Sequence, residues 1–189
     1  MNPILSILTP TIPGREEQLK RLSDSIAAQS TGLPVEHLVL CDNRARSIGA
    51  KRQALVDIAR GKYIAFCDDD DSIEHCYVSE LLKAAASGAD VITFSQNAYV
   101  NGQQSFVHFS ARNPDGPFAP GGTTLRNLWH VCAWRREVIA GCQFGESNYG
   151  EDLVWCQQAR RRVRTEHHIG KVLHVYRHDE STTAAPMPV

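Results

Sequence analysis

The sequence predicts an α/β fold, built on one central and mostly parallel sheet that is flanked by helices. Short apolar runs alternate with helical patterns through the first half of the chain. The clearest apolar run covers residues 63–67, and the four consecutive carboxylates of residues 68–71 follow it directly. Such a run is typical of a buried parallel strand, and open α/β sheets bind ligands at the carboxyl ends of these strands. The sequence therefore predicts a ligand site at the end of this strand.

The expected elements of the first half follow one another as strand and helix. Each expected strand is an apolar run stopped by polar residues, proline or glycine, and each expected helix has apolar residues three or four positions apart. The strands are expected over residues 4–8, 37–41, 63–67 and 90–94, and the helices over residues 16–29, 49–59 and 78–86. Strands that are joined by helices in this order require parallel pairing and right-handed crossovers.

The second half of the chain has a different pattern. Residues 99–109 alternate around Asn101 and Gly102, a signal typical of a β-hairpin. Residues 112–122 hold three prolines and three glycines, so they predict a long irregular loop. The remaining pattern allows a strand and then a helix within residues 125–140, and it predicts a helix over residues 151–162 and a strand over residues 172–176.

The composition is that of a soluble globular chain. A hydrophobic fraction of 42% and 189 residues suffice for a full core in one domain, and a net charge of -1 argues neither for nor against a nucleic-acid partner. The six cysteines form no CxxC pair, which is typical of reduced thiols in a cytoplasmic protein. The sequence shows no basic leader and no stretch near the roughly 20 apolar residues of a membrane-spanning helix.

Acidic residues also occur at two other predicted element ends. Asp42 follows the expected strand over residues 37–41, and Glu151 with Asp152 follows Gly150 at the start of a helix. A hard divalent cation carrying phosphate oxygens is the natural occupant of such a set of carboxylates. The alternatives are a solvated acidic turn that caps the next helix, and acids that only favour a helix dipole.

These stretches, in this order, resemble glycosyltransferase family 2, with its GT-A fold and DxD motif, from Leu5 to about Thr182. The opening residues 6–11 and residues 39–43 are similar to the family's first two strands. Further similar segments are residues 47–53 and 59–64 before the metal-site strand, residues 68–70 at the DxD motif, residues 131–139 before the catalytic loop, residues 150–152 at the ED motif, and residues 176–178 with Ser181 at the closing motif. The sequence departs from the family at residues 12–15, and it keeps only one of two paired acids, as Asp42.

The resemblance implies a role for each candidate residue. Asp152 is expected to be the general base, with Glu151 beside it. The implied metal ligands are Asp70, Asp68 and His178, which would hold Mn²⁺ or Mg²⁺. The residues implied to contact the nucleotide sugar are Thr9, Pro10, Thr11, Asp42, Arg46, Lys51, Asp68, Asp69 and Arg177. The implied reaction is an inverting transfer from a nucleoside-diphosphate sugar, with a UDP-sugar favoured.

The single expected domain has two halves and a tail. Residues 1–95 are expected to bind the nucleotide sugar, residues 96–182 to supply the acceptor and catalytic side, and residues 183–189 to form a flexible tail. The acceptor is not identified by the sequence. The short stretch between residues 94 and 129 indicates an open face for a large or polymeric acceptor. The basic run at residues 160–164 either binds an acceptor that is a nucleic acid or is a solvated helix face.

Two other functions fit part of the pattern. A nucleotidyltransferase that makes a sugar nucleotide usually has a glycine-rich basic loop after its first strand, and residues 9–15 contain only one glycine and one arginine. A non-catalytic module that binds nucleotide sugars would not need acids at all three positions. The tryptophans near the ED motif fit either core packing or stacking on a sugar or base; they are Trp129, Trp134 and Trp155.

Overall fold

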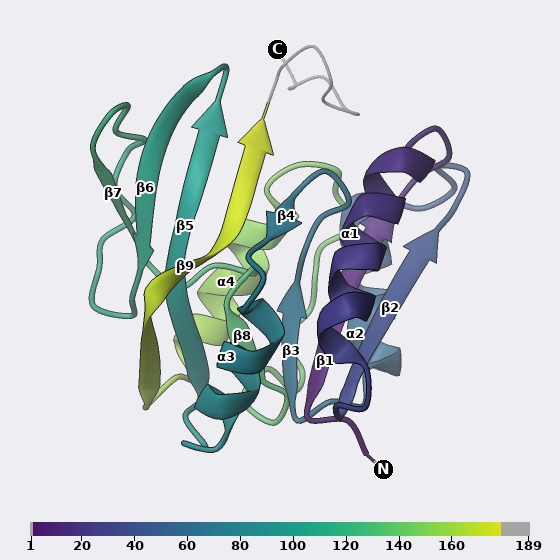
Figure 1. Cartoon of the computed structure of the whole chain (residues 1–189), viewed down its shortest axis with the longest axis horizontal. Coiled ribbons are helices and arrows are strands. Elements are labelled where there is room, and N and C mark those ends of the chain that lie inside the picture. Colours follow the sequence, from purple (N-terminus) through teal and green to yellow (C-terminus); the bar gives the residue numbers. More distant parts are fainter. Residues whose placement is uncertain (1, 179–189) are drawn as a thin grey trace.

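The alternating apolar runs form one large sheet with helices on both of its faces (Figure 1). The structure is a computed structural model that describes residues 2–178. The first half contains β1 (Leu5–Thr11), α1 (Glu16–Ser30), β2 (Val35–Cys41), α2 (Ile48–Ile58), β3 (Tyr63–Phe66), β4 (Ser72–Ile73) and α3 (Tyr77–Ala85). The second half contains β5 (Val91–Val100), β6 (Gln103–Phe109), β7 (Thr123–Arg126), β8 (Ala133–Arg135), α4 (Glu151–Arg160) and β9 (Glu166–His178). The tail predicted at residues 183–189 lies outside the described residues.

The strand order of the sheet is β2-β1-β3-β8-β5-β6-β7, and β9 pairs with both β5 and β4. β1 is parallel to β2 and to β3, and β9 is parallel to β5. β8 is antiparallel to β3 and to β5. Consequently β1, β2, β3, β5 and β9 all run in one direction and end at one edge of the sheet (Figure 1). The predicted α/β fold is confirmed, and the edge predicted to carry the site is the edge where these five strands end.

The period of two along β3 divides the core between the two faces of the sheet. Ile64 and Phe66 pack in one apolar cluster with Trp155 of α4, whereas Tyr63 and Ala65 pack in the other. The second cluster also takes the buried residues of α1 and α3. Because β3 is buried on both faces, its sequence is continuously apolar, as the sequence pattern indicated.

Three elements differ from the sequence-based expectation. β5 continues to Val100 because it pairs with β6 and β9 along its polar residues, which end the apolar run but not the strand. β9 begins at Glu166, before its apolar run, because its polar first residues also pair with β5. The helix allowed within residues 125–140 is absent, since β8 is followed by turns. The hairpin is confirmed, with positive φ at Asn101 (48°) and Gly102 (78°).

All six cysteines are free, in agreement with the prediction of reduced thiols. Within the described residues, no helix is long and apolar enough to cross a membrane.

Candidate active site

The four carboxylates of residues 68–71 follow β3 at the edge where the parallel strands end. Two of the four are committed to the protein itself. Asp69 is 2% exposed, and it accepts hydrogen bonds from the Thr11 hydroxyl and from Arg15, both at 2.5 Å. Asp71 lies 3.3 Å from Nε2 of the buried His174 and accepts the backbone N–H of Arg177. These two side chains hold the acidic loop in place.

The other two carboxylates are more open. Side-chain exposure is 27% for Asp68 and 39% for Asp70. Burial together with the charges of Asp71 and Asp68 raises the pKa of Asp70 to about 7, although Arg15 lies 3.1 Å away. One oxygen of Asp68, Oδ1, is buried without a hydrogen-bond partner in the part of the chain that the structure describes. The loop therefore holds more negative charge than its neighbours neutralise.

Arg52 of α2 joins the acidic loop to the predicted ED motif. It is 4% exposed, and its guanidinium lies 2.9 Å from Asp68 and 3.3 Å from Glu151. Burial is the largest influence on Asp68 and would raise its pKa, but the attraction of Arg52, its hydrogen bond and the nearby imidazoles together lower that pKa below its ordinary value. The ring of Phe66 lies under the guanidinium, at 5.1 Å.

The ED motif is held by the start of α2. α4 begins after Gly150, whose φ of 73° lies in the left-handed region that favours glycine. Gly49 of α2 packs against the loop before α4 so closely that a Cβ there would lie 1.9 Å from the carbonyl oxygen of Gly145. Its backbone N–H donates to the carbonyl of Ser147 at 3.0 Å. Glu151 is consequently buried under α2, and burial raises its pKa, whereas the side chain of Asp152 keeps 23% exposure.

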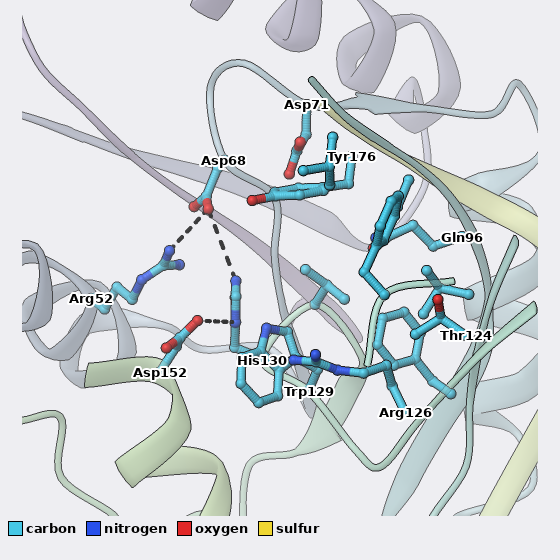
Figure 2. A pocket seen from close by; sticks show the side chains of 16 residues that line it. Arg52, Asp68, Asp71, Gln96, Thr124, Arg126, Trp129, His130, Asp152 and Tyr176 are labelled. Atoms are coloured by element: carbon cyan, nitrogen blue, oxygen red, sulfur yellow. Dashed lines mark hydrogen bonds and ion pairs between the residues drawn. The ribbon is translucent and has the colours of Figure 1, made fainter. Parts of the chain in front are cut away.

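His130 lies between the two acidic sides of the site. Its Nδ1 is 3.4 Å from Asp152 and its Nε2 is 3.9 Å from Asp68 (Figure 2). Burial and the nearby cation of Arg52 lower the pKa of His130 to about 4, so the imidazole is neutral at pH 7. The ring therefore separates two carboxylates without adding charge.

These groups line one pocket of about 320 Å³. Figure 2 shows Asp68, Asp71 and Asp152 at one end, and the hydroxyl of Tyr176 pointing toward Asp68. The other end is formed by β5, β6, β7 and the loop between β6 and β7, with mostly apolar side chains. Arg126 lies over the ring of Trp129 at 4.5 Å, at the side of the pocket. A pocket of this volume is at the small end of the range of about 300–1,000 Å³ for small-molecule sites.

The predicted nucleotide contacts lie at the ends of β1 and β2. Lys51 is buried and binds both Asp42, at 3.2 Å, and the carbonyl of Thr11, at 3.1 Å. Asp42 also accepts the backbone N–H of Arg46. Thr9 is fully buried, and its hydroxyl donates to the carbonyl of Cys67. Pro10 is buried in β1 between these two threonines. The structure thus brings most of this predicted set to one edge.

The predicted metal ligands are not gathered as a finished site. Among residues 2–178, no three His, Cys, Asp or Glu side chains are placed to hold a metal ion. The ring of His178 stacks on Tyr176 instead, with centroids 6.4 Å apart. The chemistry of the loop nevertheless fits a hard cation, because Asp68 has a buried oxygen without a partner and Asp70 has a raised pKa. The assignment of Asp68, Asp70 and His178 to a metal remains a prediction.

The sequence did not assign a role to four residues of this site: Arg52, Gln96, His130 and Tyr176. Arg52 and Tyr176 lie inside segments that resemble family motifs, so their position gave a signal. His130 and Gln96 had none, because a single histidine or glutamine in a strand or loop is not distinctive. Gln96 is placed by the pairing of β5 with β6 and β9, and His130 lies in the loop between β7 and β8.

The remaining predicted features are mainly structural. Trp134 and Trp155 are fully buried, and only Trp129 lines the pocket. Within the basic run, Arg160 pairs with Asp115 at 2.6 Å, and Arg162 donates to the carbonyl of Ala140. Two of the four arginines are therefore engaged within the fold, which leaves little of the run for a nucleic-acid surface.

Comparison with known proteins agrees with this geometry. A family model described as glycosyl transferase family 2 matches residues 38–140, and no curated protein matches. A solved structure of TarS residues 1–349 from S. aureus in complex with UDP-GlcNAc has 14% identity and a TM-score of 0.67, covering 96% of this chain and 61% of that one. The same protein in complex with UDP has 15% identity and a TM-score of 0.68, covering 93% of this chain and 61% of that one.

The chain spans about three-fifths of the length of these TarS structures. At this identity the likeness shows a shared fold, which confirms the architecture predicted from the sequence. The family model shows more, because it covers over half of the 189 residues, from β2 to the turn after β8. The chain belongs to glycosyl transferase family 2.

Proposed function

We propose that this chain transfers a sugar from a UDP-sugar to a nucleophile of an acceptor, with Mn²⁺ or Mg²⁺ and with inversion at the anomeric carbon. One observation carries the proposal. Asp68 at the end of β3 and Asp152 at the start of α4 line the same pocket, although 84 positions separate them in the chain. A donor-binding acid and a base thus face one cavity.

Asp152 is the proposed general base. Its carboxylate is partly exposed, and it would take the proton of the acceptor as that group attacks the anomeric carbon. The neutral ring of His130 lies beside this carboxylate, with Nδ1 3.4 Å away. Glu151 is proposed to support the base through Arg52, because its own carboxylate is buried against that guanidinium.

The ends of β1 and β2 and the acidic loop are the proposed donor side. Lys51 with Asp42 forms a fixed buried pair beside Thr11, and Asp69 holds Thr11 from the other side. Asp68, Asp70 and His178 are the proposed metal ligands, with Arg46 and Arg177 beside the diphosphate. A bound divalent cation would neutralise the negative charge that develops on the leaving nucleoside diphosphate. The donor half would comprise residues 1–95 and the acceptor half residues 96–182, in a cytoplasmic protein.

The test measures release of UDP from a UDP-sugar in the presence of Mn²⁺, with water as the default acceptor. Asp152→Asn should lower kcat by about 10²–10⁴-fold and leave donor binding nearly unchanged, because only proton transfer is lost. Asp70→Asn should weaken donor binding in the presence of metal. Asp24→Asn is the matched control, since Lys20, on the surface, is the one partner of Asp24 within residues 2–178.

Full activity in folded Asp152→Asn and Asp70→Asn variants would contradict the proposal. Formation of pyrophosphate from a nucleoside triphosphate and a sugar phosphate would establish a nucleotidyltransferase instead.

A further inference from the structure

The apolar end of the pocket contains a polar side chain whose amide remains accessible from the cavity. Gln96 of β5 is 7% exposed and lines the pocket. None of the described residues forms a hydrogen bond with its side-chain amide. Both amide atoms remain accessible from the cavity, where water bonds them until a ligand takes its place. The fold therefore presents a donor and an acceptor to whatever occupies the pocket.

The walls around Gln96 are apolar. Ala98 and Val100 follow it on the same face of β5, because side chains alternate along a strand. Val107 lies opposite Gln96 in the register of β6, and Phe109 lies two positions further on. Phe118 of the loop between β6 and β7 completes this end. One amide among these walls fits a ligand group that is partly apolar and carries its own donor and acceptor.

The charge of the pocket restricts that group further. The acidic end carries Asp68, Asp71 and Asp152. Of the two arginines that line the pocket, Arg52 is paired with Asp68 and Glu151, and Arg126 lies over the ring of Trp129. A carboxylate or phosphate substituent would meet this excess of negative charge, and an ammonium group would lie against apolar walls. A neutral substituent fits both ends.

We propose that Gln96, the first residue of the proposed acceptor half, reaches the donor in the shared pocket: it is a specificity-determining residue that binds the acetamido group of an N-acetylated amino sugar, the sugar of the donor. The acetamido N–H would donate to the Gln96 carbonyl oxygen, and its carbonyl would accept from the Gln96 amide. Its methyl group would pack against Val107 and the neighbouring apolar side chains. A hydroxyl in its place would leave this apolar volume unfilled. This inference rests on the proposed transfer from a UDP-sugar.

The experiment compares two UDP-sugar donors that differ only at C2, one with an acetamido group and one with a hydroxyl. Donor binding and UDP release are measured with Mn²⁺ for the wild type, for Gln96→Met and for Gln103→Met. Methionine keeps the length of glutamine and removes both hydrogen-bonding groups. Gln103 is exposed on β6 and does not line the pocket, so Gln103→Met is the matched control.

We expect the wild type to prefer the acetamido donor in kcat/KM. Gln96→Met should lower the ratio between the two donors by about tenfold to a hundredfold, the range expected for a buried group that loses its partner. Gln103→Met should leave the ratio unchanged. Without donor, Gln96→Met should be about as stable as the wild type, because none of the described residues bonds the Gln96 amide.

Equal use of both donors by the wild type would overturn the inference, and so would an equal loss on both donors in Gln96→Met. The wild-type comparison needs no variant, so it can overturn the inference even if Gln96→Met fails to fold. Absence of UDP release and of binding with either donor would instead count against the proposed function, which keeps the two failures distinct.

Discussion

At the residue scale, one guanidinium supports both acidic sides of the site. Arg52 is buried between Asp68 and Glu151, which come from the end of β3 and the start of α4. Without the guanidinium between them, these two carboxylates would repel one another. The position of each carboxylate therefore depends on the same side chain.

We expect Arg52→Met to destabilise the protein by about 3–5 kcal/mol, because it leaves the buried Glu151 and the partly buried Asp68 without their cation. Urea denaturation at pH 7 measures the effect. Arg60→Met is the matched control: Arg60 pairs with Glu36 at the surface with 75% exposure, so its loss should change stability by about 1 kcal/mol or less. Equal effects of the two substitutions would show that Arg52 has no special role.

Asp70 gives a prediction about pH. Its pKa in the folded protein, about 7, lies above the ordinary value of about 3.9, because of burial and the neighbouring carboxylates Asp71 and Asp68. Its contribution to stability is therefore full below about pH 4 and is lost as pH rises through about 7. In EDTA, Asp70→Asn should melt at a higher temperature than the wild type at pH 8, and the difference should shrink toward pH 5. A difference in melting temperature that does not depend on pH would contradict this prediction.

At the scale of elements, the contact between α2 and the loop before α4 determines where the ED motif lies. We expect Gly49→Ala to destabilise the protein by about 1–3 kcal/mol, because the new methyl group would overlap the carbonyl of Gly145. It should also lower kcat, since the loop that leads to Asp152 must shift. Thermal melting and UDP release measure the two effects.

Gly145→Ala is the control for this contact. A Cβ at Gly145 meets no atom within 4 Å, so the stability and the kcat of Gly145→Ala should remain near those of the wild type. A tolerated Gly49→Ala variant with normal activity would show that the start of α2 does not position the ED motif.

The elements also show what the sequence could predict. The apolar run of residues 63–67 is buried on both faces, so its strand and the acidic loop after it were evident from local pattern alone. β5 and β9 extend beyond their apolar runs, because pairing between them holds polar residues such as Gln96 in extended structure. Local pattern carries no information on such pairing, which is why Gln96 and His130 were found only in the structure.

At the scale of the whole molecule, the candidate site is assembled from both halves of the chain. The proposed donor side lies at the ends of β1, β2 and β3, whereas the pocket needs β5, β6 and β9. The motifs that resemble family 2 were sufficient to predict most of the acidic residues. The apolar end of the pocket was not predicted, since it contains no motif.

A donor that binds only the folded state should stabilise the entire molecule. At a concentration of a UDP-sugar about 100 times its Kd, the stabilisation is about 2.7 kcal/mol. For a domain of this size that corresponds to a rise in Tm of about 5–10 °C. The rise should require Mn²⁺ and should be small in EDTA or in Asp70→Asn. An equal rise with and without the metal would show that the cation does not take part in donor binding.

The position of β9 has a consequence for the time at which the protein becomes competent. β9 is the last described strand, and it enters the sheet between β4 and β5 rather than at an outer edge. It supplies His174 to Asp71 and Tyr176 to the pocket. A ribosome that adds about 5–20 residues per second makes the acidic loop several seconds before it makes β9. Until β9 is made, Asp71 of the acidic loop lacks its partner His174, and one side of β5 is unpaired. The nascent chain therefore exposes a strand edge. Binding of a nucleotide sugar cannot yet protect this edge, because the pocket is incomplete without Tyr176.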